Sequence, residues 1–245
     1  MGKIENGYIK GLVGGIVARR LGNTQVVQSR SRLKRSRQTL ATKAAAVDFG
    51  NASKSARMIR YAFWQLILGY HDPAMINRLN QQVLRTMRAN TERRRGTLCL
   101  SRGNPGRLKG FQFNEASPLG DQLFVDVDTF FSDGRLLVRL PEFDCDQDLI
   151  WPYTATHCTI RLQVYGFDFP AGRTVGLGNE SFSFPLRSRK KRVDSKQWTF
   201  DVSVVEGMVV MAGMSIEFDR EMDTRPLLLN NKNYHPAALV EVFSV

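Results

Sequence analysis

Cysteine and histidine are rare in this sequence, and the few present lack the spacing of disulfide or metal frameworks. The cysteines are odd in number and none belongs to a CxxC pair, which argues against both a disulfide scaffold and a zinc ribbon. The histidines are far apart, and none lies in a nucleophile or metal motif. We therefore expect reduced, buried thiols, no cofactor and no catalytic metal. The residues concerned are Cys99, Cys145, Cys158, His71, His157 and His235.

Long apolar runs are also lacking. No stretch approaches the ~18 apolar residues of a membrane span, so we expect none. Residues 1–18 resemble a secretory signal only briefly, because Glu5 and Lys10 interrupt them and no small-residue cleavage pattern follows. Asn6 stands where N-myristoylation needs Ser or Thr. These absences predict a chain made in the cytoplasm, and they leave open whether it is later released or incorporated into a particle.

Motifs for catalysis and phosphate binding are missing as well. The GLVGG segment at 11–15 has neither the GxGxxG spacing nor a GK[ST] ending, and Ser195 lies outside a GxSxG elbow. The acidic run DCDQD at 144–148 lacks the Gly and Glu that an EF-hand loop needs. A solvated acidic loop is the expected structure there, and calcium binding is an alternative left open. We predict a non-enzymatic protein without a small-molecule substrate.

Acidic residues are scarce in one part of the chain. Residues 1–110 hold 22 of the 35 Lys and Arg but only 4 of the 23 Asp and Glu. That segment therefore carries a net charge of +18, and the remainder carries −6. A basic segment followed by an acidic one suits binding to a polyanion or head-to-tail association with another copy.

The first predicted segment, 1–38, is an extended Gly-rich and basic arm. Glycines punctuate it, so it could form strands but has little capacity to build a core. The positions predicted to contact another subunit are Ile4, Tyr8, Ile9, Leu12, Val13, Ile16 and Val17. A dense basic run follows, and its members are predicted to contact an acidic partner surface or phosphates: Arg30, Arg32, Lys34, Arg35 and Arg37.

The second predicted segment, 39–97, is a helical hairpin. Helical character begins near Thr39 and resumes after Gly50-Asn51, with Ser53 as N-cap and Gly69 as stop. A further helix starts at Asp72-Pro73. Its apolar residues recur every three or four positions, and Arg78, Arg85 and Arg88 lie on an adjoining face, where they are predicted to contact the same partner or phosphates.

The third predicted segment, 98–245, is an antiparallel β-sandwich, Ig-like or jelly-roll-like, which makes the whole an α+β fold. Seven or eight short strands follow one another without intervening helices. The first candidates are residues 98–100 and the GFQFN run at 110–114. A second basic cluster at 187–192, between two strand candidates, could add a phosphate or carboxylate contact.

The aromatic residues indicate packing more than ligand stacking. Phe49, Tyr61, Phe63 and Trp64 have helical spacing and are predicted to lie in a core, and they are not interleaved with the basic clusters. A carbohydrate- or peptide-binding module that uses Trp151, Tyr153 and Trp198 is a further alternative, although these residues suit a sandwich core.

The beginning of the chain also carries a family resemblance. The residues that match are Met1, Gly2, Ile4, Gly11, Gly14 and Gly15, followed by a basic stretch, a Gln- and Ala-containing helix and FNEASPLGD at 113–121. In these features, up to about residue 120, the sequence resembles a family of uncharacterised Bacteroidetes proteins with a Gly-rich opening, a helical segment and a sandwich. It departs from that family at Arg19–Gly22, where members have Trp-Lys-Gly. The resemblance implies this layout and no known enzymatic activity.

The sequence thus favours one function and leaves a second open. The first is a structural subunit that assembles with copies of itself into a filament, tube or shell, through the arm and through complementary charge. The alternative is a nucleic-acid-binding or packaging protein that uses the basic run and the helices.

Overall fold

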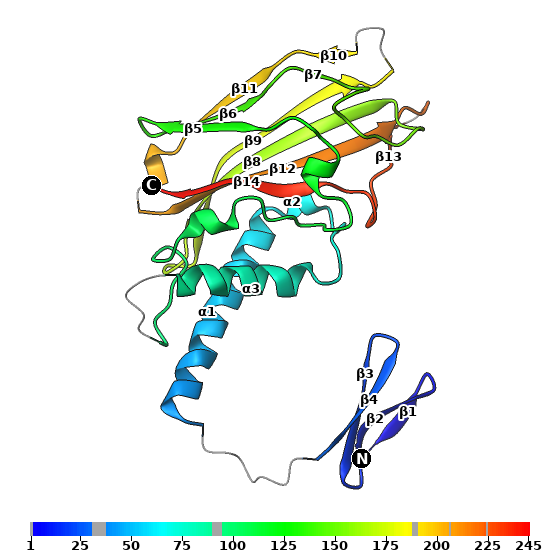
Figure 1. Ribbon diagram of the computed structural model, residues 1–245, viewed down its shortest axis with the longest axis vertical. Helices are drawn as coiled ribbons and strands as arrows, with labels where there is room; N and C mark the ends of the chain where they lie inside the picture. The colour runs from blue at the N-terminus through cyan, green and yellow to red at the C-terminus, as the bar shows by residue number, and fades with distance from the viewer. Residues whose placement is uncertain (1, 31–37, 90–94, 188–190, 206, 224) are drawn as a thin grey trace. The chain divides into compact units, whose positions relative to one another are not determined.

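The computed structural model describes residues 2–30, 38–89, 95–187, 191–205, 207–223 and 225–245 (Figure 1). Contacts within the chain divide it into two compact units, Met1–Leu40 and Ala41–Val245. The helical segment 39–97, from Ala41 onward, and the sandwich 98–245 were expected as separate domains, but both lie in the second unit. They do so because the helices and one sheet share a core, described below.

The first unit is a four-stranded antiparallel meander, in which each strand pairs with the next along the chain. Its strands are β1 (Lys3–Glu5), β2 (Tyr8–Val13), β3 (Ile16–Leu21) and β4 (Thr24–Ser29). Two-residue turns join them, and Asn6-Gly7 has the positive φ angles, 51° and 77°, that tight hairpin turns require. The expectation of an extended arm is therefore corrected, because the regular glycines encode hairpin turns and the segment pairs with itself.

The meander has almost no interior of its own. Among its described residues only Ala18 is buried, with 2% of its surface exposed. A sheet must bury its apolar face against another layer, and the described residues of this unit form a single layer. Its exposed large apolar side chains are Ile4, Ile9, Val13, Ile16, Leu21 and Val27.

The second unit begins with helices. They are α1 (Leu40–Ala62), α2 (Trp64–Ile67) and α3 (Met75–Arg88). The expected break at Gly50-Asn51 is absent, since α1 runs through it, and Ser53 is therefore an interior residue and not an N-cap. The predicted stop at Gly69 is close to the observed one, because α2 ends at Ile67 and both Leu68 and Gly69 adopt positive φ.

Antiparallel sheets form the rest of the second unit. The largest has β9 (Arg173–Pro185), β8 (His157–Asp168) and β12 (Val209–Arg220) side by side, and both β13 (Leu227–Leu228) and β14 (Ala237–Ser244) pair with β12. A second sheet has the order β11 (Lys196–Asp201), β6 (Arg135–Leu140), β5 (Asp128–Ser132). A short ladder joins β10 (Arg192–Val193) to β7 (Phe143–Asp144). The predicted sheet-rich α+β architecture is confirmed, and it is consistent with a β-sandwich.

Two strand predictions fail at the start of this region. Residues 98–100 form no strand, and the 110–114 run contributes only an isolated bridge between Gln112 and Ala238. Short one-turn helices form at Pro105–Leu108 and Leu119–Asp121 in this stretch, and another forms at Ser203–Val205, between β11 and β12. Apolar residues in this stretch pack against the helices without entering a ladder, as Phe113 does.

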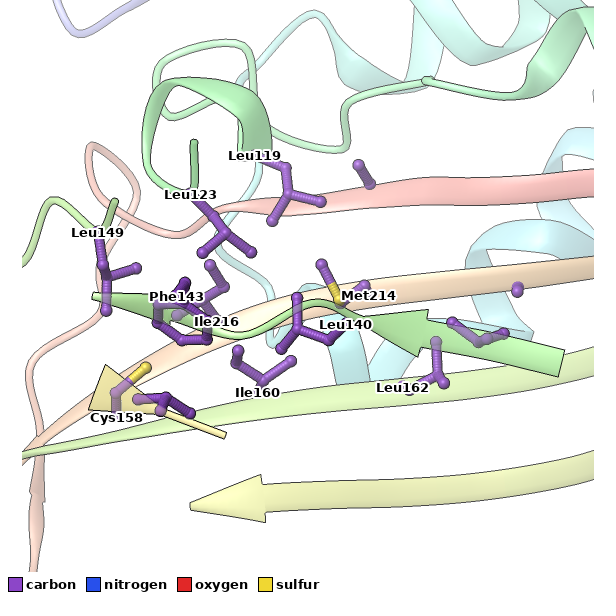
Figure 2. Close-up of a cluster of buried hydrophobic side chains, with 14 of the residues drawn as sticks. Leu119, Leu123, Leu140, Phe143, Leu149, Cys158, Ile160, Leu162, Met214 and Ile216 are labelled. Atoms are coloured by element: carbon purple, nitrogen blue, oxygen red, sulfur yellow. The ribbon is translucent and has the colours of Figure 1, made fainter. Parts of the chain in front are cut away.

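The largest sheet is buried on both faces, which creates two cores. Ten consecutive residues of β12, Val209–Phe218, are buried, as expected for a strand covered on both sides. In the first core, Leu140, Ile160 and Met214 come from β6, β8 and β12 and lie together between the two sheets (Figure 2). In the second core, Met211 packs with residues of α1, α2 and α3, which cover the other face (Figure 1).

A buried histidine ties the helices to the sheet. His235 is fully buried, and its Nε2 lies 2.6 Å from the carbonyl oxygen of Leu66 in α2. Its Nδ1 lies 2.9 Å from Nδ2 of Asn230, so the neutral ring donates through Nε2 and accepts through Nδ1. Asn230 in turn bonds the backbone of Ile216 and Phe218 in β12.

Acidification should therefore weaken the second unit. Burial lowers the pKa of His235, because the charged ring would be desolvated. The unfolded chain takes up this proton near pH 6.5 and the folded chain does so only at lower pH, so stability is full above about 6.5 and falls below it. We expect up to about 1.4 kcal/mol of loss per pH unit from this group. Urea unfolding at pH 7.5, 6.5 and 5.5 measures it, and His235→Gln should flatten the dependence; an equal slope in that variant would contradict the assignment.

Candidate assembly interface

The meander carries the residues predicted to contact another subunit. Of these seven, Ile4, Ile9, Val13 and Ile16 are exposed, and Ile4 is the most open at 77%. Tyr8, Leu12 and Val17 are half-buried. The meander thus presents apolar side chains from three of its strands, as a surface that associates with another protein would.

Tyr8 is used inside the meander. The Arg20 guanidinium lies 4.4 Å from the centre of the Tyr8 ring, and the Tyr8 hydroxyl donates to the carbonyl of Asn23 at 3.2 Å. The side chain of Gln25 also crosses the sheet and bonds both backbone groups of Ile9 at 3.0 Å. These contacts join β2 to β3, to β4 and to the turn between them, which compensates in part for the missing core.

The predicted basic contacts divide into three groups. Arg32, Lys34, Arg35 and Arg37 lie outside the described residues. Arg30, Arg85 and Arg88 are not buried, so they remain available to a partner. Arg78 is the third group, because it pairs with acidic residues of the chain itself.

Arg78 is an internal ion-pair residue, which corrects its assignment as a phosphate contact. Its guanidinium bonds Asp72, lies 3.2 Å from Glu115 and donates to the carbonyl of Gln112 at 3.0 Å. Burial alone would raise the pKa of Asp72, but the hydrogen bond from Arg78 and bonds from the backbone bring the pKa below its usual value. Sequence spacing placed Arg78 on a basic helix face but could not reveal these partners.

The structure brings together a cationic and aromatic pocket that the sequence did not predict. The pocket has a volume of about 210 Å³ and lies between α1, α2 and the beginning of α3. Its lining residues are Arg57, Arg60, Tyr61, Trp64, Ile67, His71, Met75 and Ile76. This volume is below the about 300 Å³ at which drug-sized sites begin, so the pocket has room for one ring system.

Two aromatic residues of this pocket contradict the expectation that they pack in a core. Tyr61 is 66% exposed and Trp64 is 58% exposed, and Phe49 on α1 is exposed as well, whereas Phe63 is buried as predicted. The guanidinium of Arg57 lies 5.1 Å from the centre of the Tyr61 ring. Basic and aromatic side chains of α1 and α2 therefore lie side by side, which contradicts the sequence-based expectation. That expectation failed because apolar spacing alone does not tell which side of α1 meets the sheet.

Arg60 is the most enclosed cation of the pocket. Partial burial lowers the pKa of Arg60, the nearby Tyr61 opposes this shift, and the charge of Arg57 adds a smaller lowering. An arginine stays protonated at neutral pH even so. Two guanidinium groups and an exposed indole that line one pocket could bind an anion that carries a flat ring.

The acidic loop uses its carboxylates internally. Asp148 accepts from the backbone N–H of Asp144 at 2.8 Å, and Asp144 accepts from that of Asp146 at the same distance. Asp146 pairs with Lys191, and this bond raises the pKa of Lys191. Across the described residues, no group of three or more His, Cys, Asp or Glu is arranged to hold a metal ion.

The second basic cluster is partly neutralised in the same way. Arg187 donates to the carbonyls of Tyr153 and Ala155, and Arg192 lies 3.3 Å from Glu142. Residues 188–190 are outside the described part of the chain. The described members of the cluster thus meet oxygen atoms of the chain itself, which leaves less of their charge for a phosphate.

The residues of the carbohydrate-binding alternative do not form one surface feature. Trp151 and Trp198 are half-buried and pack against the first core, and the Trp151 indole donates to the carbonyl of Cys145 at 3.3 Å. Tyr153 is exposed beside Arg187. Two of the three therefore serve packing, as the sequence suggested.

Buried charge also occurs on the largest sheet. Arg161 Nε donates to Glu217 at 2.5 Å, with Glu217 only 6% exposed. Burial first, and then the charge of Glu217, raise the pKa of the nearby Asp219. No sequence pattern indicated this cluster, because Arg161 and Glu217 are 56 residues apart until β8 pairs with β12.

Comparison with known proteins identifies no relative: no family model, no curated protein and no solved structure matches this chain. The resemblance to the Bacteroidetes family therefore stays a prediction. In the described part of the chain, no helix combines the length and apolar character needed to cross a membrane.

Proposed function

We propose that this protein is a non-enzymatic structural subunit that assembles with copies of itself through its N-terminal meander. The observation that carries the proposal is the meander itself, a single-layer sheet with one buried residue and six exposed large apolar side chains among its described residues. Covering those side chains on association would stabilise both the sheet and the assembly.

The contrast between the two units supports this assignment. The second unit has two extensive cores, so its fold does not depend on the meander. The residues of both cores belong to the second unit, whereas the meander supplies exposed apolar side chains for association. An Ig-like or jelly-roll-like topology for the sandwich, and growth into a filament, tube or shell, belong to the same proposal.

Charge provides a second source of attraction between copies. The net charge of +18 in residues 1–110 and −6 in the remainder would favour contacts between the basic part of one copy and the acidic part of another. Such contacts are screened at high salt, whereas burial of apolar surface is not weakened in this way. Sedimentation velocity of the full chain and of a chain without the meander, at low and high salt, tests the proposal.

The cationic and aromatic pocket favours a second candidate function, binding of single-stranded nucleic acid. Stacking of a base on Trp64 and pairing of phosphates with Arg57 and Arg60 would use the exposed indole and both guanidinium groups of this site. Arg85 and Arg88 of α3, together with the basic run at 30–37, add positive charge to the same protein.

Single-site variants should separate the two contributions to this binding. Replacing Arg57 and Arg60 by Gln should reduce the slope of log affinity against log salt by about 0.7 for each phosphate that is no longer paired. Trp64→Ala should weaken the binding free energy by roughly 1–3 kcal/mol and leave the slope of log affinity against log salt unchanged. Fluorescence titration with a labelled oligonucleotide measures both effects, and Arg107→Gln, an exposed arginine elsewhere, is the control. If wild type does not bind in about 0.15 M salt, or all variants bind equally, this candidate function is wrong.

A further inference from the structure

We propose that strand β4 pairs antiparallel with β4 of a second copy about a two-fold axis centred on Val27. This inference rests on the proposed assembly through the meander and specifies the contact. β4 is an edge strand, since within the described residues it pairs with β3 alone. Its partner would extend the sheet across the two copies.

The composition of β4 suits an edge that is meant to pair. Soluble proteins protect exposed edges with charged residues, proline or bulges. The six residues of β4, TQVVQS, include no charged residue and no proline, and their register with β3 is unbroken. Val27 is 53% exposed, so its side chain gains burial when another strand is added.

The direction of the backbone groups follows from one hydrogen bond. The N–H of Arg30 donates to the carbonyl of Gly15 at 2.7 Å, in line with the ladder between β3 and β4. Paired residues in an antiparallel ladder alternate between hydrogen-bonded and non-hydrogen-bonded positions. The even-numbered residues of β4 therefore bond β3, and Gln25, Val27 and Ser29 direct their N–H and C=O groups outward.

Symmetry then selects the register. A two-fold axis perpendicular to a sheet keeps each residue on the same face, and opposed residues in an antiparallel ladder also share a face. The ladder must therefore be centred on a single residue. Centring on Val27 places Val27 against Val27 of the second copy and Gln25 against Ser29, which satisfies all the outward groups with about six main-chain hydrogen bonds.

The other edge of the meander is a poorer partner for β4. β1 has only three residues, and two of them are charged, with Lys3 and Glu5 in an ion pair at 3.7 Å. A three-residue strand would leave part of the outward groups of β4 unpaired. Pairing of β4 with itself avoids this loss and introduces no like charges within the strand.

Charge substitution at the axis tests the contact in the full chain. Val27→Lys and Val27→Glu each place like charges face to face, so each should abolish the two-fold pairing. An equal mixture of the two variants should restore the pairing, because Lys of one copy then faces Glu of the other. Sedimentation equilibrium measures the mass against 27.8 kDa for one chain. Ala171→Lys adds the same charge at an exposed turn position of the second unit, so it is the matched control and should associate like wild type.

Disulfide trapping tests the register independently. Val26 and Gln28 of the two copies would form a non-hydrogen-bonded pair, with Cα atoms about 4.5 Å apart, within disulfide range. On a Cys99→Ser background, a mixture of Val26→Cys and Gln28→Cys chains should cross-link under mild oxidation, whereas either chain alone should not. Cys145 and Cys158 are buried and should not compete.

The outcomes separate the contact from the wider proposal. Restored mass in the mixture and cross-linking only between the two cysteine chains support the β4 contact. If wild type associates but Val27→Lys associates equally, or the charge mixture stays at the mass of one chain, the β4 contact is wrong while assembly through the meander stands. If the wild-type chain remains single at all concentrations and salts, the proposed function fails as well.

Discussion

Removal of residues 2–29 should leave a folded chain that no longer assembles. This deletion takes away the four strands of the meander and keeps the basic run at 30–37, so it separates apolar association from charge. Because the second unit has its own two cores, its circular dichroism spectrum and unfolding midpoint should stay close to those of the full chain. Sedimentation velocity should show a single chain at all concentrations at which the full-length protein associates.

The matched control for this deletion changes charge and keeps the strands. Neutral replacement of Arg30, Arg32, Lys34, Arg35 and Arg37 should leave association at high salt unchanged, because screened charges contribute little there. At low salt the same replacements should weaken association if these residues meet the acidic part of another copy. Particles of the same size from the deleted chain would contradict a role of the meander in assembly.

Substitution of Gly213 should produce a large loss of stability from one added carbon atom. This residue lies in β12, beneath α1 and α2, and a Cβ there would come within 2.8 Å of the Phe63 ring and 2.9 Å of Leu66. Both side chains are fully buried, so neither can move aside freely. We expect Gly213→Ala to lower the free energy of unfolding by about 1–3 kcal/mol, the usual cost of overpacking.

Urea unfolding of matched variants measures this effect. Gly120→Ala is the control, because a Cβ at that position meets no atom within 4 Å, and it should be neutral or slightly stabilising. Phe63→Leu should be destabilising alone, but in combination with Gly213→Ala the total loss should be smaller than the sum. If the losses of the two single variants add up to the loss of the double variant, the Phe63 ring does not pack on Gly213 as described.

The cationic and aromatic pocket shows why sequence periodicity could find the helix but not its exposed side. Phe63 and Trp64 are adjacent in sequence, yet Phe63 is buried against the sheet and Trp64 is exposed. Both fit an apolar pattern at helical spacing. The choice between them depends on how α1 and α2 meet the largest sheet, which no local pattern specifies.

The sequence by itself determined the local features of this protein. The apolar run of β12 specifies a strand, and the three- and four-residue spacing from Ile76 to Met87 specifies α3. These features depend on the φ preferences and side-chain periods of neighbouring residues. The uneven charge and the missing motifs likewise need no structure to be seen.

The tertiary structure alone decided which surfaces remain for function. It paired Arg78 with Asp72 and Glu115, left Tyr61 and Trp64 exposed, and folded the expected arm into a sheet whose edge strand is β4. Each of these outcomes depends on contacts between residues that are distant in sequence or on different elements. Local propensity cannot encode them, because the free energy of such contacts depends on what the rest of the chain places beside each residue.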